Sequence, residues 1–307
     1  MLRLTFLGTA ASRPTVGRNV SALLINREGE LLLFDCGEGT QRQMMRFGTG
    51  FAVDDIFISH MHADHFLGII GLLRTMGLQG RESELRLWGP RGCVPILETA
   101  VHLGIDRIPF PVAIAEMEPG SVLRRDGYDL VAFRTRHGPP SIGYALVEHE
   151  RLGRFNPERA RALGVPPGPL FGRLHHGEAI EIGGRLVRPE DVVGPPRPGR
   201  RVVYSGDTRP CQETAAAAAD ADVLVHDATF ADEEQDRARS TGHATASEAA
   251  ALARSARALR LVLTHLSARY AEDPRQLERE ARAIFPASVV AYDGMHVEVP
   301  FRDGDDE

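Results

Sequence analysis

The strongest structural signal in this chain of 307 residues is the run Ile56-Phe57-Ile58-Ser59-His60-Met61-His62-Ala63-Asp64-His65. A short apolar stretch, typical of a buried strand, ends at a cluster of histidines with one aspartate. Such a cluster is hard to explain as packing, because each side chain would need a hydrogen-bond partner in a crowded turn. Imidazole and carboxylate are both ligands that zinc accepts. The run therefore predicts a metal site on a strand-to-helix loop.

Further along the chain, the same layout recurs: an apolar strand followed by a residue that can bind a metal. The segments are 130–133 before His137, 201–204 before Asp207, 223–225 before His226 and Asp227, and 261–264 before His265. In α/β sheets, ligands bind outside the carboxyl ends of the strands. The sequence thus predicts an α/β fold that gathers one site at a sheet edge.

Other elements follow from local patterns. Alternating or apolar runs predict strands at 2–7, 21–26 and 30–35, the last two joined as a hairpin. Helical spacing predicts a helix at 66–78, and alanine-rich runs predict packing helices at 214–221 and 247–258, with Thr245 or Ser247 as a cap.

Residues 151–200 break this pattern. Proline and glycine clusters surround one short helical stretch, 157–163, and the whole segment is too long for a simple turn. We interpret it as an arm inserted into one domain rather than as a linker between two domains.

Composition excludes several classes of protein. The formal net charge of -6 argues against a protein that coats nucleic acid non-specifically. The three cysteines are isolated, so a disulfide framework and a Cys-x-x-Cys zinc site are both excluded. No stretch of eighteen apolar residues and no signal peptide is recognisable, which predicts a cytoplasmic protein without a membrane segment.

The cluster His60-x-His62-x-Asp64-His65 matches the signature of the metallo-β-lactamase superfamily in full. Later motifs narrow the resemblance to the ribonuclease Z family, the bacterial short-form tRNA 3′-processing endonucleases. They are Ser205-Gly206-Asp207-Thr208-Arg209, Gly242-His243-Ala244-Thr245 and Thr264-His265-Leu266-Ser267. The resemblance covers almost the whole chain. It implies an α/β fold, an αββα sandwich of two mixed sheets flanked by helices, formed by a single domain over 1–307 with a protruding, flexible arm at 151–200.

The resemblance also implies a ligand set for two Zn²⁺ ions per subunit, with Asp207 as the bridging ligand. One zinc would be held by His60, His62, His137 and Asp207, and the other by Asp64, His65, His265 and Asp207. Two adjacent cations can neutralise a phosphodiester and activate a shared water.

Three residues are expected to act in catalysis. Asp64 would accept a proton from the nucleophilic water, and His243 would supply one to the leaving 3′ oxygen, positioned by Asp227. The family has Glu where this chain has Asp227. A purely structural role stays open for both: His243 as a loop histidine that caps the next helix, and Asp227 as an interior carboxylate. Asp35 is expected to orient the histidine loop.

The resemblance implies a metal-dependent endoribonuclease that removes the 3′ trailer from precursor tRNA. The products would be a 3′-hydroxyl on the tRNA and a 5′-phosphate on the trailer. A homodimer is implied, in which the arm of one subunit clamps the tRNA bound to the other. The residues expected to contact RNA are Arg18, Asn19, Arg151, Arg154, Arg159, Arg161 and Arg173.

One position departs from the family pattern near the N-terminus. Val16 stands in Pro14-Thr15-Val16-Gly17-Arg18-Asn19 where the family has Lys, which leaves open whether an encoded CCA end blocks cleavage. Two other functions stay open at this stage: a hydrolase of the same fold that acts on small phosphodiesters or esters, and a non-catalytic, zinc-containing protein that binds tRNA.

Overall fold

A computed structural model describes residues 1–105 and 107–302. They form two compact units: Met1–Val147 with Arg201–Pro300, and Glu148–Arg200 with residues 301–302. Within the described part of the chain, no helix is long and apolar enough to cross a membrane.

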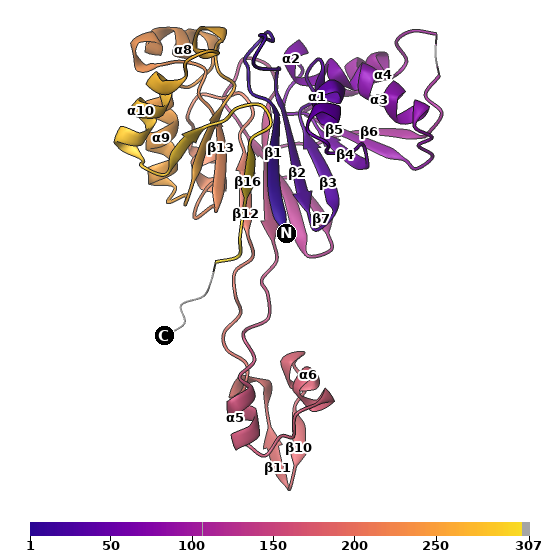
Figure 1. Cartoon of the computed structure of the whole chain (residues 1–307), viewed down its shortest axis with the longest axis vertical. Helices are drawn as coiled ribbons and strands as arrows, with labels where there is room; N and C mark the ends of the chain where they lie inside the picture. Colours follow the sequence, from indigo (N-terminus) through magenta and orange to yellow (C-terminus); the bar gives the residue numbers. More distant parts are fainter. Residues whose placement is uncertain (106, 303–307) are drawn as a thin grey trace. The chain divides into compact units, whose positions relative to one another are not determined.

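The larger unit is built on two seven-stranded sheets (Figure 1). The order of the first sheet is β16 (His296–Glu298), β1 (Leu2–Gly8), β2 (Ala22–Arg27), β3 (Glu30–Phe34), β4 (Val53–Phe57), β5 (Leu85–Gly89) and β6 (Val112–Glu116). The order of the second is β15 (Ser288–Val290), β14 (Leu261–Thr264), β13 (Val223–Asp227), β12 (Arg201–Tyr204), β9 (Ile142–Glu148), β8 (Tyr128–Arg134) and β7 (Val122–Arg125). Both sheets are mixed, because each joins antiparallel strands to a parallel set.

The helices lie in two groups, one for each sheet. Those next to the first sheet in the chain are α1 (Thr40–Arg46), α2 (Ala63–Phe66), α3 (Gly68–Leu78) and α4 (Val94–Val101). Those next to the second sheet are α7 (Gln212–Ala217), α8 (Gln235–Thr241), α9 (Ala246–Ser255) and α10 (Arg275–Ile284), with 3₁₀ turns at Asp232–Glu234 and Ala268–Tyr270.

Three hydrophobic clusters show how these layers are held together. The first lies between the sheets and contains stacked and edge-on aromatic rings, among them Phe34, Phe57 and Tyr144. The second joins the alanine-rich face of α9 to β13 and β14, and the third joins α3 and α4 to the first sheet. Helix, sheet, sheet and helix therefore follow one another, as the resemblance implies.

Most predicted elements of this unit are present, with shifted ends. Strands β12 and β14 have the predicted bounds, and β2 and β3 form the expected hairpin. The helix predicted at 66–78 is divided into α2 and α3, and the helix predicted at 214–221 ends early, at Ala217. Thr245 is the N-cap of α9, where its side chain accepts a hydrogen bond from the backbone N–H of Glu248.

The smaller unit is folded rather than irregular. It contains α5 (Pro157–Ala162), α6 (Pro169–His175), the hairpin of β10 (Ile180–Ile182) and β11 (Arg185–Val187), and a 3₁₀ turn at Pro189–Asp191. A small apolar core unites these elements: Ala160, Val165, Leu174, Ile180, Val187 and Val192. The sequence had shown only α5, with nearly its observed bounds.

Candidate metal centre

The predicted ligands come from separate strand ends. His60 and His62 follow β4, His137 follows β8, Asp207 follows β12, and His265 follows β14. Asp64 and His65 lie in α2, immediately after the same loop that carries His60. Residues about two hundred positions apart thus meet at one edge, because the parallel strands of both sheets end there.

The side chains fall into two groups around one carboxylate. Ligand atoms of His60, His62, His137 and Asp207 all lie within 4.8 Å of one another, and those of Asp64, His65 and His265 form a second such group. The Oδ2 atom of Asp207 lies 3.3 Å from Nε2 of both His65 and His265 and 3.6 Å from Nε2 of His60. Asp207 therefore stands between the two groups.

Buried polar atoms without partners show that this arrangement suits a metal. Nε2 of His60, Nε2 of His65 and Oδ1 of Asp207 are buried and lack a hydrogen-bond partner among the described residues. Leaving such atoms unpaired costs about 1–3 kcal/mol each. Tetrahedral bonds of about 2.0–2.2 Å separate two ligand atoms by roughly 3.3–3.6 Å. The observed spacing fits a shared cation better than it fits direct hydrogen bonds.

Hydrogen bonds at the far side of the rings orient the histidines. Nδ1 of His65 donates to Asp35 Oδ2 at 2.7 Å, and Nδ1 of His137 donates to the Gly242 carbonyl at 3.0 Å. Each bond places the proton on Nδ1, so the lone pair of Nε2 faces the centre. Burial, and then the neighbouring His65, hold the pKa of His60 well below its usual value, which keeps that ring neutral for a metal.

Asp35 occupies the place predicted for it and holds the histidine loop. Its carboxylate is fully buried and accepts hydrogen bonds from the Ser59 backbone N–H, the Ser59 hydroxyl and the Tyr204 hydroxyl, at 2.6–2.8 Å. With His65 it therefore has four donors. These are the contacts expected of a residue that orients the histidine loop, and that role stays a prediction.

Backbone geometry is tight around the bridging carboxylate. Gly206 has φ +58°, and a Cβ at this position would lie 2.6 Å from Cβ of Ser59. Glycine alone tolerates both the positive φ and the close contact with Ser59. The end of β12 can therefore pass close to the histidine loop. His265 also adopts a left-handed conformation, with φ 59°, which is uncommon outside glycine and typical of functional sites.

His243 lies beside the metal-ligand groups in contact with Asp227. Nδ1 of His243 donates to Asp227 Oδ2 at 2.7 Å, and the His243 ring stacks on His265 with centroids 5.1 Å apart. Burial alone would lower the pKa of His243, but the adjacent Asp227 carboxylate raises it to about 9. A histidine in this state is a proton donor at neutral pH.

Comparisons with known proteins agree with this geometry. A family model described as a beta-lactamase superfamily domain matches residues 190–266, and one described as anti-Pycsar protein Apyc1 matches residues 2–150. The chain is 57% identical to ribonuclease Z of Gemmatimonas aurantiaca, with 97% of this chain and 96% of the relative covered. It is 55% identical to ribonuclease Z of Myxococcus xanthus, with 99% of each covered.

The chain belongs to the ribonuclease Z family. Among solved structures, the short form of human tRNase Z is similar to it, with a TM-score of 0.71 at 28% identity, over 97% of this chain and all of the human one. A metallo-beta-lactamase fold protein of Bacillus subtilis, YhfI, shares the fold at 19% identity and a TM-score of 0.70, over 97% of this chain and all of the other. The αββα sandwich predicted from the resemblance is therefore confirmed, and membership of the family supports a metal cofactor at the centre described above.

Arg18 and Asn19, the two residues of the N-terminal loop expected to contact RNA, form hydrogen bonds with other residues of this chain. Arg18 is buried, and its guanidinium donates to the carbonyls of Ala271 and Ala291 and to the Thr9 hydroxyl. The Asn19 side chain donates to the Glu38 carbonyl. The charge of Arg18 therefore stabilises the loop from within, and a contact of Arg18 with RNA stays a prediction. Val16, in the same loop, is fully exposed.

The five arm arginines differ in their surroundings. Arg154, Arg159 and Arg161 are exposed, and the last two lie on α5. Arg173 is exposed and pairs with Glu178, whereas Arg151 covers the ring of Phe301, with Cζ 3.5 Å from the centroid. Arg159 and Arg161 are therefore more accessible to a phosphate than Arg151 and Arg173.

Sequence reasoning missed two supporting side chains of this ribonuclease Z family member. The Thr229 hydroxyl donates to Asp227 Oδ1 at 2.8 Å and lies 3.0 Å from Nδ1 of His265. Arg209 donates to the His243 carbonyl at 2.6 Å and forms a bidentate pair with Glu248. Thr229 lies two positions after Asp227 in the sequence, and this proximity was the one signal that could have indicated its role. The partners of Arg209 are distant in sequence and gave none.

Proposed function

We propose that this protein is a metal-dependent endoribonuclease that removes the 3′ trailer from precursor tRNA. The products would be a tRNA with a 3′-hydroxyl and a trailer with a 5′-phosphate. The observation that supports this most strongly is the double group of histidines around the Asp207 carboxylate, in a chain of the ribonuclease Z family. A cytoplasmic location is part of this proposal.

Two Zn²⁺ ions are the cofactors we infer for this centre. The first would be held by His60, His62, His137 and Asp207, and the second by Asp64, His65, His265 and Asp207. When bound, such a pair supplies charge neutralisation at the scissile phosphate and a water that is easier to deprotonate. The donor set, imidazole and carboxylate without thiolate, is one that zinc accepts.

The protein's own groups would move the protons. Asp64 Oδ2 accepts a hydrogen bond from the Ser12 backbone N–H at 2.8 Å, which fixes the carboxylate that would take the proton of the attacking water. His243 uses Nδ1 to contact Asp227, so its Nε2–H can be given to the leaving 3′ oxygen. Asp227 is one methylene shorter than the family's Glu and still reaches His243.

We also infer that precursor tRNA contacts the smaller unit and that two copies of the chain associate. The exposed guanidiniums of Arg154, Arg159 and Arg161 are suited to phosphate contacts. Light scattering at working concentration would test the homodimer: a mass of twice the chain is expected, and a monomer that processes precursor tRNA at full rate would contradict it.

The catalytic assignment is tested with Asp64→Ala and a count of bound metal. Unaltered protein is expected to hold about two zinc ions per chain, measured by atomic emission after gel filtration. Asp64→Ala is expected to lower turnover by roughly 10²- to 10⁴-fold. Asp54→Ala, which changes an exposed aspartate of strand β4, is the control and should leave turnover unchanged. Full turnover of Asp64→Ala with its metal retained would rule Asp64 out as the base, and one metal per chain would contradict the two-ion site.

A further inference from the structure

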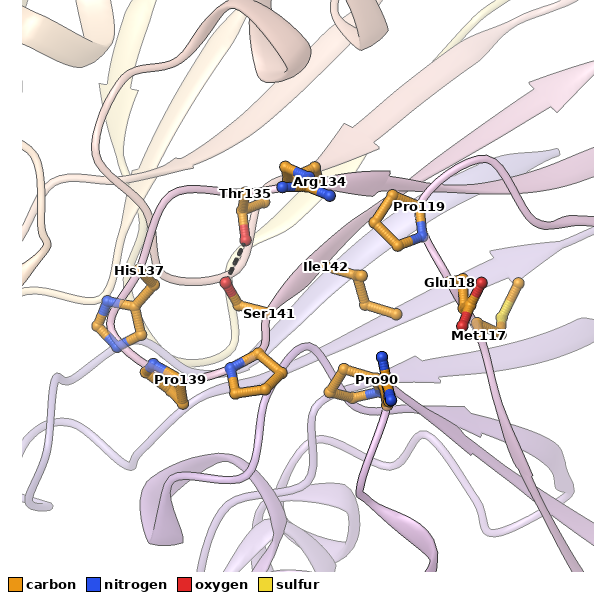
Figure 2. Close-up of a pocket in the computed structure, with 12 residues that line it drawn as sticks. Pro90, Met117, Glu118, Pro119, Arg134, Thr135, His137, Pro139, Ser141 and Ile142 are labelled. Atoms are coloured by element: carbon orange, nitrogen blue, oxygen red, sulfur yellow. Dashed lines mark hydrogen bonds between the residues drawn. The ribbon is translucent and has the colours of Figure 1, made fainter.

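A cavity of about 540 Å³ lies directly beside His137 in the larger unit (Figure 2). Its volume is within the range of small-ligand sites, roughly 300–1,000 Å³. Three loops enclose it: the one after β5, the one between β6 and β7, and the one after β8. Figure 2 shows His137 at one end of the cavity and Met117 with Glu118 at the other. This cavity, lined by Met117, Arg134 and Ile142 among others, is called the base pocket below.

The inner surface of the base pocket is apolar and rigid. Met117 and Ile142 are buried, with 3% and 2% of their surface exposed. The other apolar lining residues are Pro90, Pro119, Pro139 and Pro140. The ring of each proline fixes its backbone φ, which restricts the conformations of these loops. This part of the pocket surface is therefore formed before a ligand binds. A flat, apolar ligand group fits such a surface.

The rim of the base pocket carries both signs of charge. Arg91 and Arg134 are exposed guanidiniums, and Glu118 is an exposed carboxylate. In the part of the chain that the structure describes, none of the three forms an ion pair. A site for phosphate alone would be weakened by the carboxylate. The edge of a nucleobase offers donors as well as acceptors, so it can use both kinds of group.

Hydrogen bonds fix the base pocket to the metal centre. The loop after β8 is closed by the Thr135 hydroxyl, which donates to Ser141 Oγ at 2.8 Å (Figure 2). The Arg136 N–H donates to Thr208, the residue after Asp207, and the Ile142 N–H donates to the carbonyl of Ser59, the residue before His60. These two hydrogen bonds join the pocket wall to residues next to Asp207 and His60, so a ligand in the pocket would lie beside the metal centre.

We propose that the base pocket binds the base of one of the two nucleotides that flank the scissile phosphate. This rests on the proposed function, since it takes the substrate to be RNA. The base lies on Met117 and the prolines, and its edge meets Arg134 and Glu118. Apolar contact with such a surface does not distinguish strongly among the bases, which suits an enzyme that must accept many precursors.

The test uses precursor tRNAs that lack one base. Three substrates are compared: an intact precursor, one abasic immediately 5′ of the cleavage site, and one abasic immediately 3′ of it. Met117→Ala is expected to lower kcat/KM on the intact precursor by roughly 10-fold, the effect of losing an apolar contact with the base. On one abasic substrate, and only on that one, the variant and the unaltered enzyme should have equal kcat/KM. Hydrolysis of a small aryl phosphodiester should be unchanged.

Two further variants guard against a change in folding. Arg134→Ala changes only an exposed group of the rim and should show the same dependence on the same abasic substrate. Arg124→Ala is the matched control, because it removes an arginine that lies away from the pocket. Arg124 is opposite Asp129 in the ladder of β7 and β8, and Asp129 is roughly 16 Å along β8 from Arg134. Cleavage of the intact precursor by the unaltered enzyme tests the proposed function separately. Normal cleavage with equal losses on all three substrates, or with no loss in either pocket variant, overturns the base pocket.

Discussion

Two buried carboxylates, Asp35 and Asp227, each accept a hydrogen bond from a histidine at the metal centre. Asp35 accepts the Nδ1 proton of His65, and Asp227 accepts that of His243 and, through the Thr229 hydroxyl, is connected to His265. Neither is assigned as a metal ligand. Their effect is to fix which ring nitrogen carries the proton, and so to turn the other nitrogen toward the metal or the substrate.

Replacement of Asp35 should weaken metal binding without touching a ligand. In Asp35→Asn, the amide NH₂ cannot accept from the four donors that now surround the carboxylate. The zinc affinity is expected to fall by roughly 10- to 100-fold, measured by competition with a chromogenic chelator. Asp54→Asn, exposed at the surface, is the control. Equal affinities in both variants would show that Asp35 does not orient the loop.

The pH dependence of turnover should report on His243. Because the Asp227 carboxylate raises its pKa to about 9, the donor form is fully present below that pH and is lost as the pH rises through it. In Asp227→Asn that stabilisation of the charged ring is absent, so the alkaline limb of kcat should move to lower pH. An alkaline limb that stays in place in Asp227→Asn would argue that His243 is not the donor.

Residue identities near the centre were predictable, whereas partners far apart in sequence were not. The ligands stand out because histidines and aspartates crowd into one turn and then recur at strand ends. The internal partners of Arg18 were not predicted, because its acceptors, the carbonyls of Ala271 and Ala291, lie more than 250 positions away. Nothing in the local sequence shows that a loop arginine will be enclosed by a distant segment.

At the scale of elements, strand ends carry the site and helix caps support it. Strands β12 and β14 were predicted with their observed bounds, because continuous apolar runs mark strands buried on both faces. Strands β10 and β11 were not predicted, since a hairpin of three-residue strands has too few residues to show a period. The division of 63–78 into α2 and α3 was also missed.

The cap of α9 offers a test at this scale. Thr245 and Glu248 form a capping box, in which each side chain accepts from the backbone N–H of the other residue. Thr245→Ala is expected to lower the free energy of unfolding by about 1 kcal/mol, measured by urea denaturation. Thr99→Ala, an exposed helix position whose hydroxyl contacts Pro95, should change it by less than about 0.5 kcal/mol. Equal shifts in the two variants would contradict the role of the cap.

At the scale of the molecule, the pairing of β9 with β12 should allow the smaller unit to be deleted. Val147 and Arg201 are paired in the ladder of β9 and β12, so the chain ends left by a deletion already lie side by side. The sequence indicated an insertion here but not its core, because the apolar residues of this core are scattered among prolines and glycines.

Deletion of residues 151–200, with a short glycine turn in their place, should separate two activities. Hydrolysis of a small aryl phosphodiester needs only the metal centre and is expected to continue at a similar rate. Processing of precursor tRNA should be abolished, because the exposed arginines of the smaller unit are lost with it. Both rates are measured on the same preparation, and equal loss of the two activities would count against a role of this unit in holding tRNA.

Mapping of the ends formed from a labelled precursor tRNA tests the central claim most directly. Purified protein with zinc is predicted to cut once, just 3′ of the discriminator nucleotide, with a 3′-hydroxyl on the tRNA and a 5′-phosphate on the trailer. Chelation should stop the reaction, and added zinc should restore it. Precursors with and without an encoded CCA, run side by side, would show the effect of Val16. A precursor left intact by protein that still hydrolyses a small phosphodiester would contradict the account.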